Sequence, residues 1–170
     1  SSLKGRIVFN SRGSKSIELD VITDNKFLGR ASAPSGASVG SHEVPSFVDN
    51  NPELTLETFE SNMAKFIGVD ASDSKAIFEI LKSLDTSNNF SGIGGSVAYA
   101  LTIAAAASAS LSLNVPLFAM LNDKGPYRFP YPLGNIVGGG SHAGPGTPDI
   151  QEVLICPMGA KTVMEALETN

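Results

Sequence analysis

The residues best suited to chemistry gather in one glycine-rich stretch, residues 138–152, which reads GGGSHAGPGTPDIQE. Its side chains that can bind polar ligand groups or transfer protons are His142, Asp149, Gln151 and Glu152. Glycine carries no Cβ, so the backbone of such a stretch can approach a ligand closely. Apolar runs at residues 132–137 and 153–157 flank it, and short apolar runs bounded by glycine and proline predict buried strands. The sequence therefore predicts a functional loop between two strands.

A second polar stretch, residues 33–45, breaks all hydrophobic periodicity with serines, glycines and His42. Two interpretations stay open from the residues alone. The stretch is either a solvated loop between a strand and a helix, or a lid with glycine hinges and inward-facing hydroxyls.

Other familiar chemistries have weaker support. Gly92-Ile-Gly94 precedes a predicted helix, but the third glycine of a dinucleotide loop is missing, and no Gly-Lys-Ser/Thr of a P-loop occurs. His42 and His142 lie in separate loops without a nearby cysteine, so a zinc site lacks ligands. A Ser-His-Asp triad stays open because serines are plentiful, although no nucleophile-elbow signature occurs.

The composition is that of a globular protein, with 42% hydrophobic and 17% charged residues in a chain of 170. A net charge of −5 argues against nucleic-acid binding. Cys156 is the single cysteine, so no internal disulfide can form, and its apolar neighbours predict a buried structural thiol. These features suit a reducing, cytoplasmic compartment. The N-terminal residues contain no apolar signal region.

One segment raises the question of a membrane. Residues 86–122 carry no charge, and their centre, residues 97–113, is long enough to cross a bilayer. This centre is built of alanine and serine rather than leucine and isoleucine. A helix that is apolar on most sides is also typical of the middle of a soluble core. We therefore predict a core helix and no membrane partner.

The first part of the chain predicts an antiparallel meander. Ile17, Leu19 and Val21 alternate with mostly polar residues, which is the pattern of a half-buried strand. Turn residues separate this run from its neighbours, so a hairpin and a further strand are expected. The three predicted strands are residues 6–9, 16–23 and 27–33.

Helices follow the meander. Apolar residues recur at helical spacing over residues 56–66 and again over residues 77–84. The uncharged helix should end near Asn114. The expected helix starts are marked by capping or first-turn residues, namely Asn51 with Pro52, Ser72 and Pro116.

Residues 126–132, PYRFPYP, contain three prolines and predict an extended linker. They separate a domain at residues 1–125 from residues 133–170, where strand, glycine-rich loop, strand and helix follow. The last helix is expected from about Ala160 and still runs at Asn170, so we expect this second domain to be only begun.

Several segments, in order along the chain, resemble enolase, the enzyme that interconverts 2-phosphoglycerate and phosphoenolpyruvate. The resemblance implies an α+β fold class, with an enolase N-terminal-like domain of a three-stranded meander and helices. It also implies the first strand-loop-strand-helix of an incomplete enolase-type (β/α)8 barrel. The insert at residues 144–149 resembles archaeal-type enolases. The matching segments are residues 10–13 (NSRG), 34–43 (PSGASVGSHE), 83–85 (SLD), 114–118 (NVPLF), 139–144 (GGSHAG), 151–152 (QE) and 157–161 (PMGAK).

The resemblance implies roles for residues of both polar stretches. Glu152 would support the acid step of catalysis, and Gln151, Glu152 and His142 would lie beside the bound substrate. Ser38 would contribute oxygen ligands to the second of two magnesium ions. The other residues of the implied lid loop are Ser35, Gly36, Ala37, Gly40 and His42.

Arg12 and Glu18 match family positions near the interface of a homodimer. The first turn departs from the family pattern, because Asn10, Ser14 and Lys15 stand where Asp, Asn and Pro are usual.

Gln151 and Glu152 pose a geometric problem. They are adjacent, and in a regular strand adjacent side chains point to opposite faces. Both can therefore reach one site only if the strand is irregular there.

The resemblance places the lysine base, the main acid and three metal carboxylates on later strands, and a complete barrel takes roughly 250 residues. We therefore expect an inactive enolase fragment, whereas the full enzyme would be a magnesium-dependent lyase of glycolysis. Two alternatives stay open. The chain could be a non-catalytic interaction or structural module, or an unrelated small-molecule binding domain with a glycine-rich loop.

Overall fold

A computed structural model describes residues 1–36, 40–122, 124–140 and 143–170. The chain divides into two compact units, Ser1–Gly125 and Pro126–Asn170.

The first unit begins with a three-stranded antiparallel sheet in the order β1-β2-β3, so the predicted meander is confirmed. The first strand starts at Ser2 rather than Arg6, because Ser2 already pairs with Ile22. The sequence did not predict this start, because neither Lys4 nor Gly5 favours a strand by itself. The strands are β1 (Ser2–Phe9), β2 (Lys15–Thr23) and β3 (Phe27–Ser32).

Helical elements follow the sheet. As expected, the Asn51 side chain accepts a hydrogen bond from the Leu54 backbone at the start of the first α-helix. The predicted cap at Ser72 is wrong. Asp70 holds the Ser72 amide and hydroxyl, and Asp73 caps the helix instead. The elements are η1 (Val48–Asn50), α1 (Pro52–Glu60), η2 (Met63–Phe66), α2 (Ser74–Leu84), α3 (Gly95–Leu113) and α4 (Leu117–Leu121).

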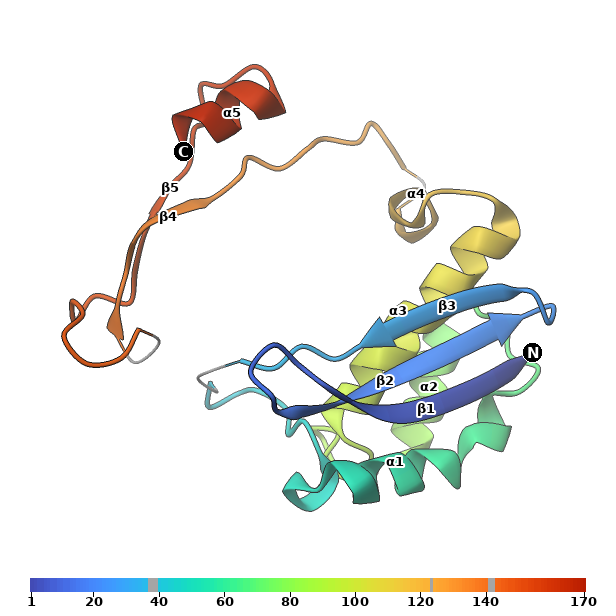
Figure 1. The fold of residues 1–170 in the computed structure, drawn as a ribbon. Coiled ribbons are helices and arrows are strands. Elements are labelled where there is room, and N and C mark those ends of the chain that lie inside the picture. The colour runs from blue at the N-terminus through green and yellow to red at the C-terminus, as the bar shows by residue number, and fades with distance from the viewer. Residues whose placement is uncertain (37–39, 123, 141–142) are drawn as a thin grey trace. The chain divides into compact units, whose positions relative to one another are not determined.

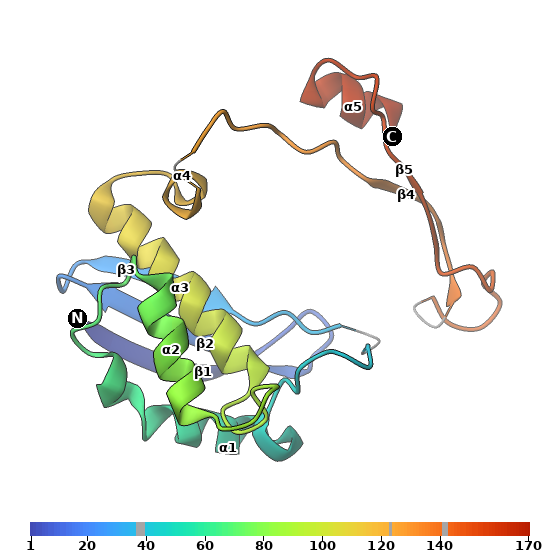
Figure 2. The same cartoon turned by 180° about the vertical axis from the view of Figure 1, so that it is seen from behind.

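The sheet and the helices form two layers. Helices α2 and α3 lie behind the sheet in Figure 1 and in front of it in Figure 2. The core between the layers is built mainly from the inward side chains of β2 and from side chains of α1, α2 and α3. Its main members are Ile17, Leu19, Val21, Phe59, Ile77, Leu81, Val97, Ala100, Leu101 and Ala104.

Helix α3 is the core helix of this unit. It ends at Leu113, which confirms the expected end near Asn114, and Asn114 adopts the left-handed conformation. By length and composition, among the described residues, it is the helix that could cross a membrane. However, Val97, Ala100 and Ala104 are fully buried against the rest of the unit. Its alanines therefore serve close packing inside a core, as the sequence predicts.

The second unit contains β4 (Gly134–Gly138), β5 (Glu152–Ile155) and α5 (Val163–Thr169). The strands pair antiparallel, with an irregularity between Asn135 and Val137. Helix α5 begins three residues later than expected, because the Thr162 side chain accepts a hydrogen bond from the Glu165 backbone and caps it.

The prediction that Cys156 is buried is wrong, because the structure leaves this thiol exposed. The two-stranded ribbon explains the difference. Its apolar side chains Ile136, Val153 and Leu154 are themselves exposed, so the described residues of the unit bury neither face of the ribbon fully.

Candidate functional site

The glycine-rich loop is closed at its base by backbone hydrogen bonds. The Gly139 amide donates to the Gln151 carbonyl oxygen at 2.9 Å, and the Gly140 amide donates to the Pro148 carbonyl oxygen at 2.8 Å. At Gly139 the two arms come so close that a Cβ atom would lie 2.3 Å from the Pro148 carbonyl oxygen. Only glycine fits there without a shift of the backbone.

The structure brings Gln151 and Glu152 to the end of this loop. Strand β5 begins at Glu152, which pairs with Gly138, while Gln151 precedes the strand. The alternation of faces in a regular strand therefore does not apply to this pair. Glu152 and Asp149 are both exposed. His142 lies outside the described residues.

The second polar stretch belongs to the first unit. Its base is attached to the sheet, because the Asn10 side-chain amide donates to the Ser35 hydroxyl oxygen at 2.6 Å. Further along, the Gly40 amide donates to the Glu43 carboxylate at 3.0 Å, and His42 is exposed. Ala37 and Ser38 lie outside the described residues, and Gly36 is exposed.

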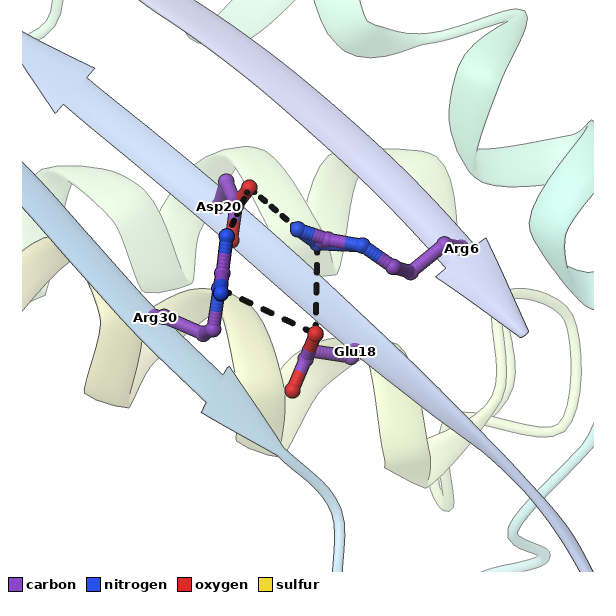
Figure 3. Close-up of polar contacts among 4 residues, drawn as sticks. All are labelled: Arg6, Glu18, Asp20 and Arg30. Carbon is purple, nitrogen blue, oxygen red and sulfur yellow. Dashed lines mark hydrogen bonds and ion pairs between the residues drawn. The ribbon is translucent and has the colours of Figure 1, made fainter. Parts of the chain in front are cut away.

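The face of the sheet opposite the helices carries a network of four charged side chains, Arg6, Glu18, Asp20 and Arg30 (Figure 3). Arg30 donates two hydrogen bonds to the Asp20 carboxylate, from Nε at 2.7 Å and from Nη2 at 3.0 Å. Arg6 also donates to Asp20, which is only 5% exposed. Opposite charges meet here because Arg6 pairs with Glu18, and Asp20 with Arg30, across neighbouring strands.

Glu18 is held more loosely than Asp20. Its carboxylate lies 3.2 Å from Arg6 Nη1 and 3.7 Å from Arg30 Nε. Although the first distance is short, Arg6 Nη1 is buried without a hydrogen-bond partner among the described residues. We regard this contact as an ion pair whose angles do not suit a hydrogen bond.

These contacts shift the pKa values of Asp20 and Arg30. The Arg30 hydrogen bonds are the largest influence on Asp20, and with the charge of Arg6 they hold its pKa below the ordinary value despite burial. Asp20 in turn raises the pKa of Arg30. The alternating pattern predicted Asp20 to face outward but not to be buried. Opposite charges at positions that pair across neighbouring strands could have predicted this network, but the alternating pattern alone did not reveal it.

Arg12, the other residue expected near a subunit interface, lies in the turn between β1 and β2 and is exposed. Among the described residues, Glu18 forms its ion pairs with Arg6 and Arg30 and not with Arg12. The two predicted interface residues are therefore not directly joined.

The donor set for a metal is incomplete in the part of the chain that the structure describes. No group of three or more His, Cys, Asp or Glu residues there is close enough to hold a metal ion. The described residues alone therefore do not form a magnesium site.

The fold and the loop define a class of protein, one in which an α+β domain precedes the first strands and helix of a barrel domain. Residues 1–121 match the family model described as "Enolase, N-terminal domain", and residues 126–170 match "Enolase, C-terminal TIM barrel domain". The chain belongs to the enolase family.

Similar proteins named enolase come mostly from archaea. The chain is 45% identical to the enolase of Methanosphaera stadtmanae over 166 residues and 43% identical to that of Methanothermobacter thermautotrophicus, in both cases over 97% of this chain. An enolase of the bacterium Legionella pneumophila is 37% identical over 98% of this chain. The chain spans about 40% of the length of these relatives.

Proposed function

We propose that the whole protein of which these residues form part is an enolase that reversibly dehydrates 2-phosphoglycerate to phosphoenolpyruvate. The observation that carries this proposal is that two enolase family models match in order and together span nearly the entire chain. The proposal includes a cytoplasmic, glycolytic role and a homodimer. It also divides the chain into an N-terminal domain at residues 1–125, a linker at residues 126–132 and a barrel segment at residues 133–170.

In this proposal the glycine-rich loop borders the substrate. Gln151 and Glu152 lie near the substrate hydroxyl, with His142 on the same loop. The Glu152 carboxylate supports protonation of the leaving hydroxide, which needs a general acid. The backbone hydrogen bonds at Gly139 and Gly140 support this role, because they hold the Gln151 end of the loop close to its glycine end.

The stretch at residues 33–45 acts as the lid loop in this proposal. Ser38 is the proposed ligand of the second magnesium ion, and Ser35, Gly36, Ala37, Gly40 and His42 form the loop around it. Magnesium prefers oxygen ligands, usually one or two carboxylates with waters and substrate oxygens, so most of its site must come from groups beyond this set. Arg12 and Glu18 are proposed to lie at the dimer interface.

The test compares two proteins in a magnesium-dependent assay of 2-phosphoglycerate dehydration. One is the 170-residue chain, and the other is a chimera in which this chain replaces the matching 40% of the Methanosphaera stadtmanae enolase. We expect turnover by the chimera and none by the 170-residue chain, whose glycine-rich loop contains only two carboxylates, Asp149 and Glu152, for metal binding and acid catalysis.

A folded chimera without turnover would contradict the enzymatic proposal and favour the non-catalytic module. Turnover by the 170-residue chain, after removal of host enolase, would contradict the assignment of the base and metal ligands to other residues. Circular dichroism of both proteins supplies the control for folding.

A further inference from the structure

The segment from Asn10 to Lys15 contacts the chain within the second polar stretch and again beyond it. Within the stretch, the Asn10 side chain donates to Ser35, which follows β3. Beyond the stretch, Lys15, the first residue of β2, forms an ion pair with Glu53 in the first turn of α1. These contacts add to the hydrogen bonds that join residue 33 to β2 and residues 45–46 to the start of α3.

Asn10 is suited to its contact with Ser35 because it uses both ends of its amide. Its oxygen accepts hydrogen bonds from the backbone amides of Arg12, at 2.9 Å, and Ser14, at 3.0 Å. The Asn10 backbone amide donates to the Ser14 carbonyl oxygen at 2.9 Å, which closes the turn. The side-chain nitrogen is then left to donate to Ser35. The same residue thus shapes the turn and attaches the neighbouring segment to it.

The second contact is charged. Lys15 donates to the Glu53 carboxylate, and this hydrogen bond is the main reason why the pKa of Glu53 lies below its ordinary value. Both side chains are about half exposed, at 45% and 51%. Salt screens exposed pairs of this kind, so this contact should weaken as ionic strength rises. The Asn10–Ser35 hydrogen bond joins two neutral groups and should not respond in this way.

The Asn10 contact also forms one wall of an open cleft. The cleft has a volume of about 400 Å³ and lies between the turn, the end of β3 and Tyr99 of α3. Asn10 and Ser35 both line it. If their hydrogen bond were lost, the segment after β3 would be free to move across this space, because Ser35 and Gly36 are exposed.

We propose that residues 10–15 are a positioning device that orders Ser35 after β3 and the first turn of α1. Asn10 and Lys15 are its positioning residues, and Ser35 and Glu53 are their attachment points. A role for this device in magnesium binding rests on the proposed function, which assigns a magnesium ligand to the connection between β3 and α1. Its effect on backbone order does not depend on the proposed function, because that effect can be measured in the 170-residue chain.

The test measures backbone order parameters by NMR relaxation at Ser35 and Gly36, beside the first contact, and at Asn51 and Glu53, beside the second. Ser35→Ala removes the first contact without touching the hydrogen bonds inside the turn. We expect order parameters at Ser35 and Gly36 to fall from about 0.85 towards about 0.6, the range of flexible backbone. Ser11→Ala is the matched control, because Ser11 lines the same cleft but has no hydrogen bond to Ser35.

Two further variants separate positioning from a general loss of stability. Asn10→Asp keeps the acceptor for the turn amides, and the Ser35 hydroxyl can donate to its second oxygen, so order should be retained. Lys15→Met should lower order at Asn51 and Glu53, next to the lost ion pair, and raising salt should do the same in the unmodified chain. Lys4→Met, at an exposed position without an ion pair among the described residues, is its control. The urea midpoint of unfolding should remain the same in all variants.

The proposal is overturned if Ser35→Ala and Lys15→Met both leave the order parameters at their original values. It is also overturned if both controls lower them equally. In the chimera, the two variants should raise the magnesium concentration needed for half-maximal turnover by about threefold to tenfold, the effect of one modest hydrogen bond. An inactive chimera would contradict the proposed function and leave the NMR result unchanged.

Discussion

Gly29 of β3 lies directly against Ala104 of α3. A Cβ atom on Gly29 would be 1.9 Å from the Ala104 carbonyl oxygen and 2.4 Å from the Ser108 backbone nitrogen. At the same place the Ser108 hydroxyl donates to the Phe27 carbonyl oxygen at 2.7 Å. The sheet and the core helix therefore meet backbone to backbone, which explains why α3 is built of such small residues.

This contact predicts a large effect of one methyl group. In Gly29→Ala the new Cβ meets backbone atoms that cannot rotate away, so β3 and α3 must separate. We expect the free energy of unfolding to fall by at least about 3 kcal/mol, at the upper end of the range for overpacking. Urea denaturation measures it. Gly40→Ala is the control, because its Cβ would meet nothing closer than 3.5 Å. Equal stability of the two variants would contradict the close contact.

Asp85 predicts a pH-dependent contribution to stability. Burial by itself raises the pKa of Asp85, but hydrogen bonds from Ser87, Gly92 and Ile93 outweigh it and hold the pKa below 3.8. The ionised form is therefore favoured by folding. Its contribution is complete well above the unfolded-state pKa of about 3.9 and is lost as the pH falls through the lower folded-state value.

We expect Asp85→Asn to lower the free energy of unfolding by about 1–3 kcal/mol at pH 7, because one oxygen that accepts from the Gly92 and Ile93 amides becomes an amide nitrogen. The difference from the unmodified chain should shrink as the pH drops below about 4. Asp73→Asn is the matched control, since asparagine caps a helix as well as aspartate does. A difference that stays constant down to pH 2 would argue against the assigned pKa direction.

The charged network on the sheet predicts that replacing Asp20 lowers stability more than replacing Glu18. Asp20 is buried and held by two arginines, whereas Glu18 has only longer contacts. Asp20→Asn should therefore lower stability by roughly 1–3 kcal/mol, because Arg6 and Arg30, whose side chains are 27% and 49% exposed, lose the charged group they contact. Glu18→Gln should cost clearly less. Thermal unfolding at low protein concentration, where association does not interfere, measures both. The reverse order would show that Glu18 is the main partner of the arginines.

The sequence predicted those parts of the fold that local patterns control. The alternation at Ile17, Leu19 and Val21 predicted the middle strand, and the Asn51-Pro52 pair marked the start of α1. Such features depend on neighbours within a few residues. The same reasoning failed at Ser72, because Asp70 competes for its amide and hydroxyl, and at Cys156, because a ribbon of two strands cannot bury both faces.

Features that depend on contacts between distant segments were not predictable in this way. Nothing in the local sequence of Gly29 distinguishes it from a glycine in a turn, and its partner Ala104 lies in another element. The burial of Asp20 likewise depends on arginines in two other strands. For the candidate site, the motif identified the loop, but the backbone hydrogen bonds of Gly139 and Gly140 emerged only from the structure.

Glu152 carries the prediction that bears most directly on catalysis. In the proposed function its carboxylate takes part in proton transfer to the leaving hydroxide, which develops charge mainly in the transition state. In the active chimera, Glu152→Gln should therefore lower kcat by about 100-fold to 10,000-fold, the usual contribution of a positioned acid or base. The KM for 2-phosphoglycerate should change little, because an interaction made only in the transition state does not alter ground-state binding.

Asp149→Asn is the matched control for this variant. Asp149 is an exposed carboxylate of the same loop, and its replacement removes the same charge three residues away. We expect it to leave kcat within about threefold, since a surface charge of this kind contributes little. If Glu152→Gln raised KM and left kcat unchanged, Glu152 would be a binding residue without a part in the proton transfer. Equal losses of kcat in both variants would point instead to the overall charge of the loop.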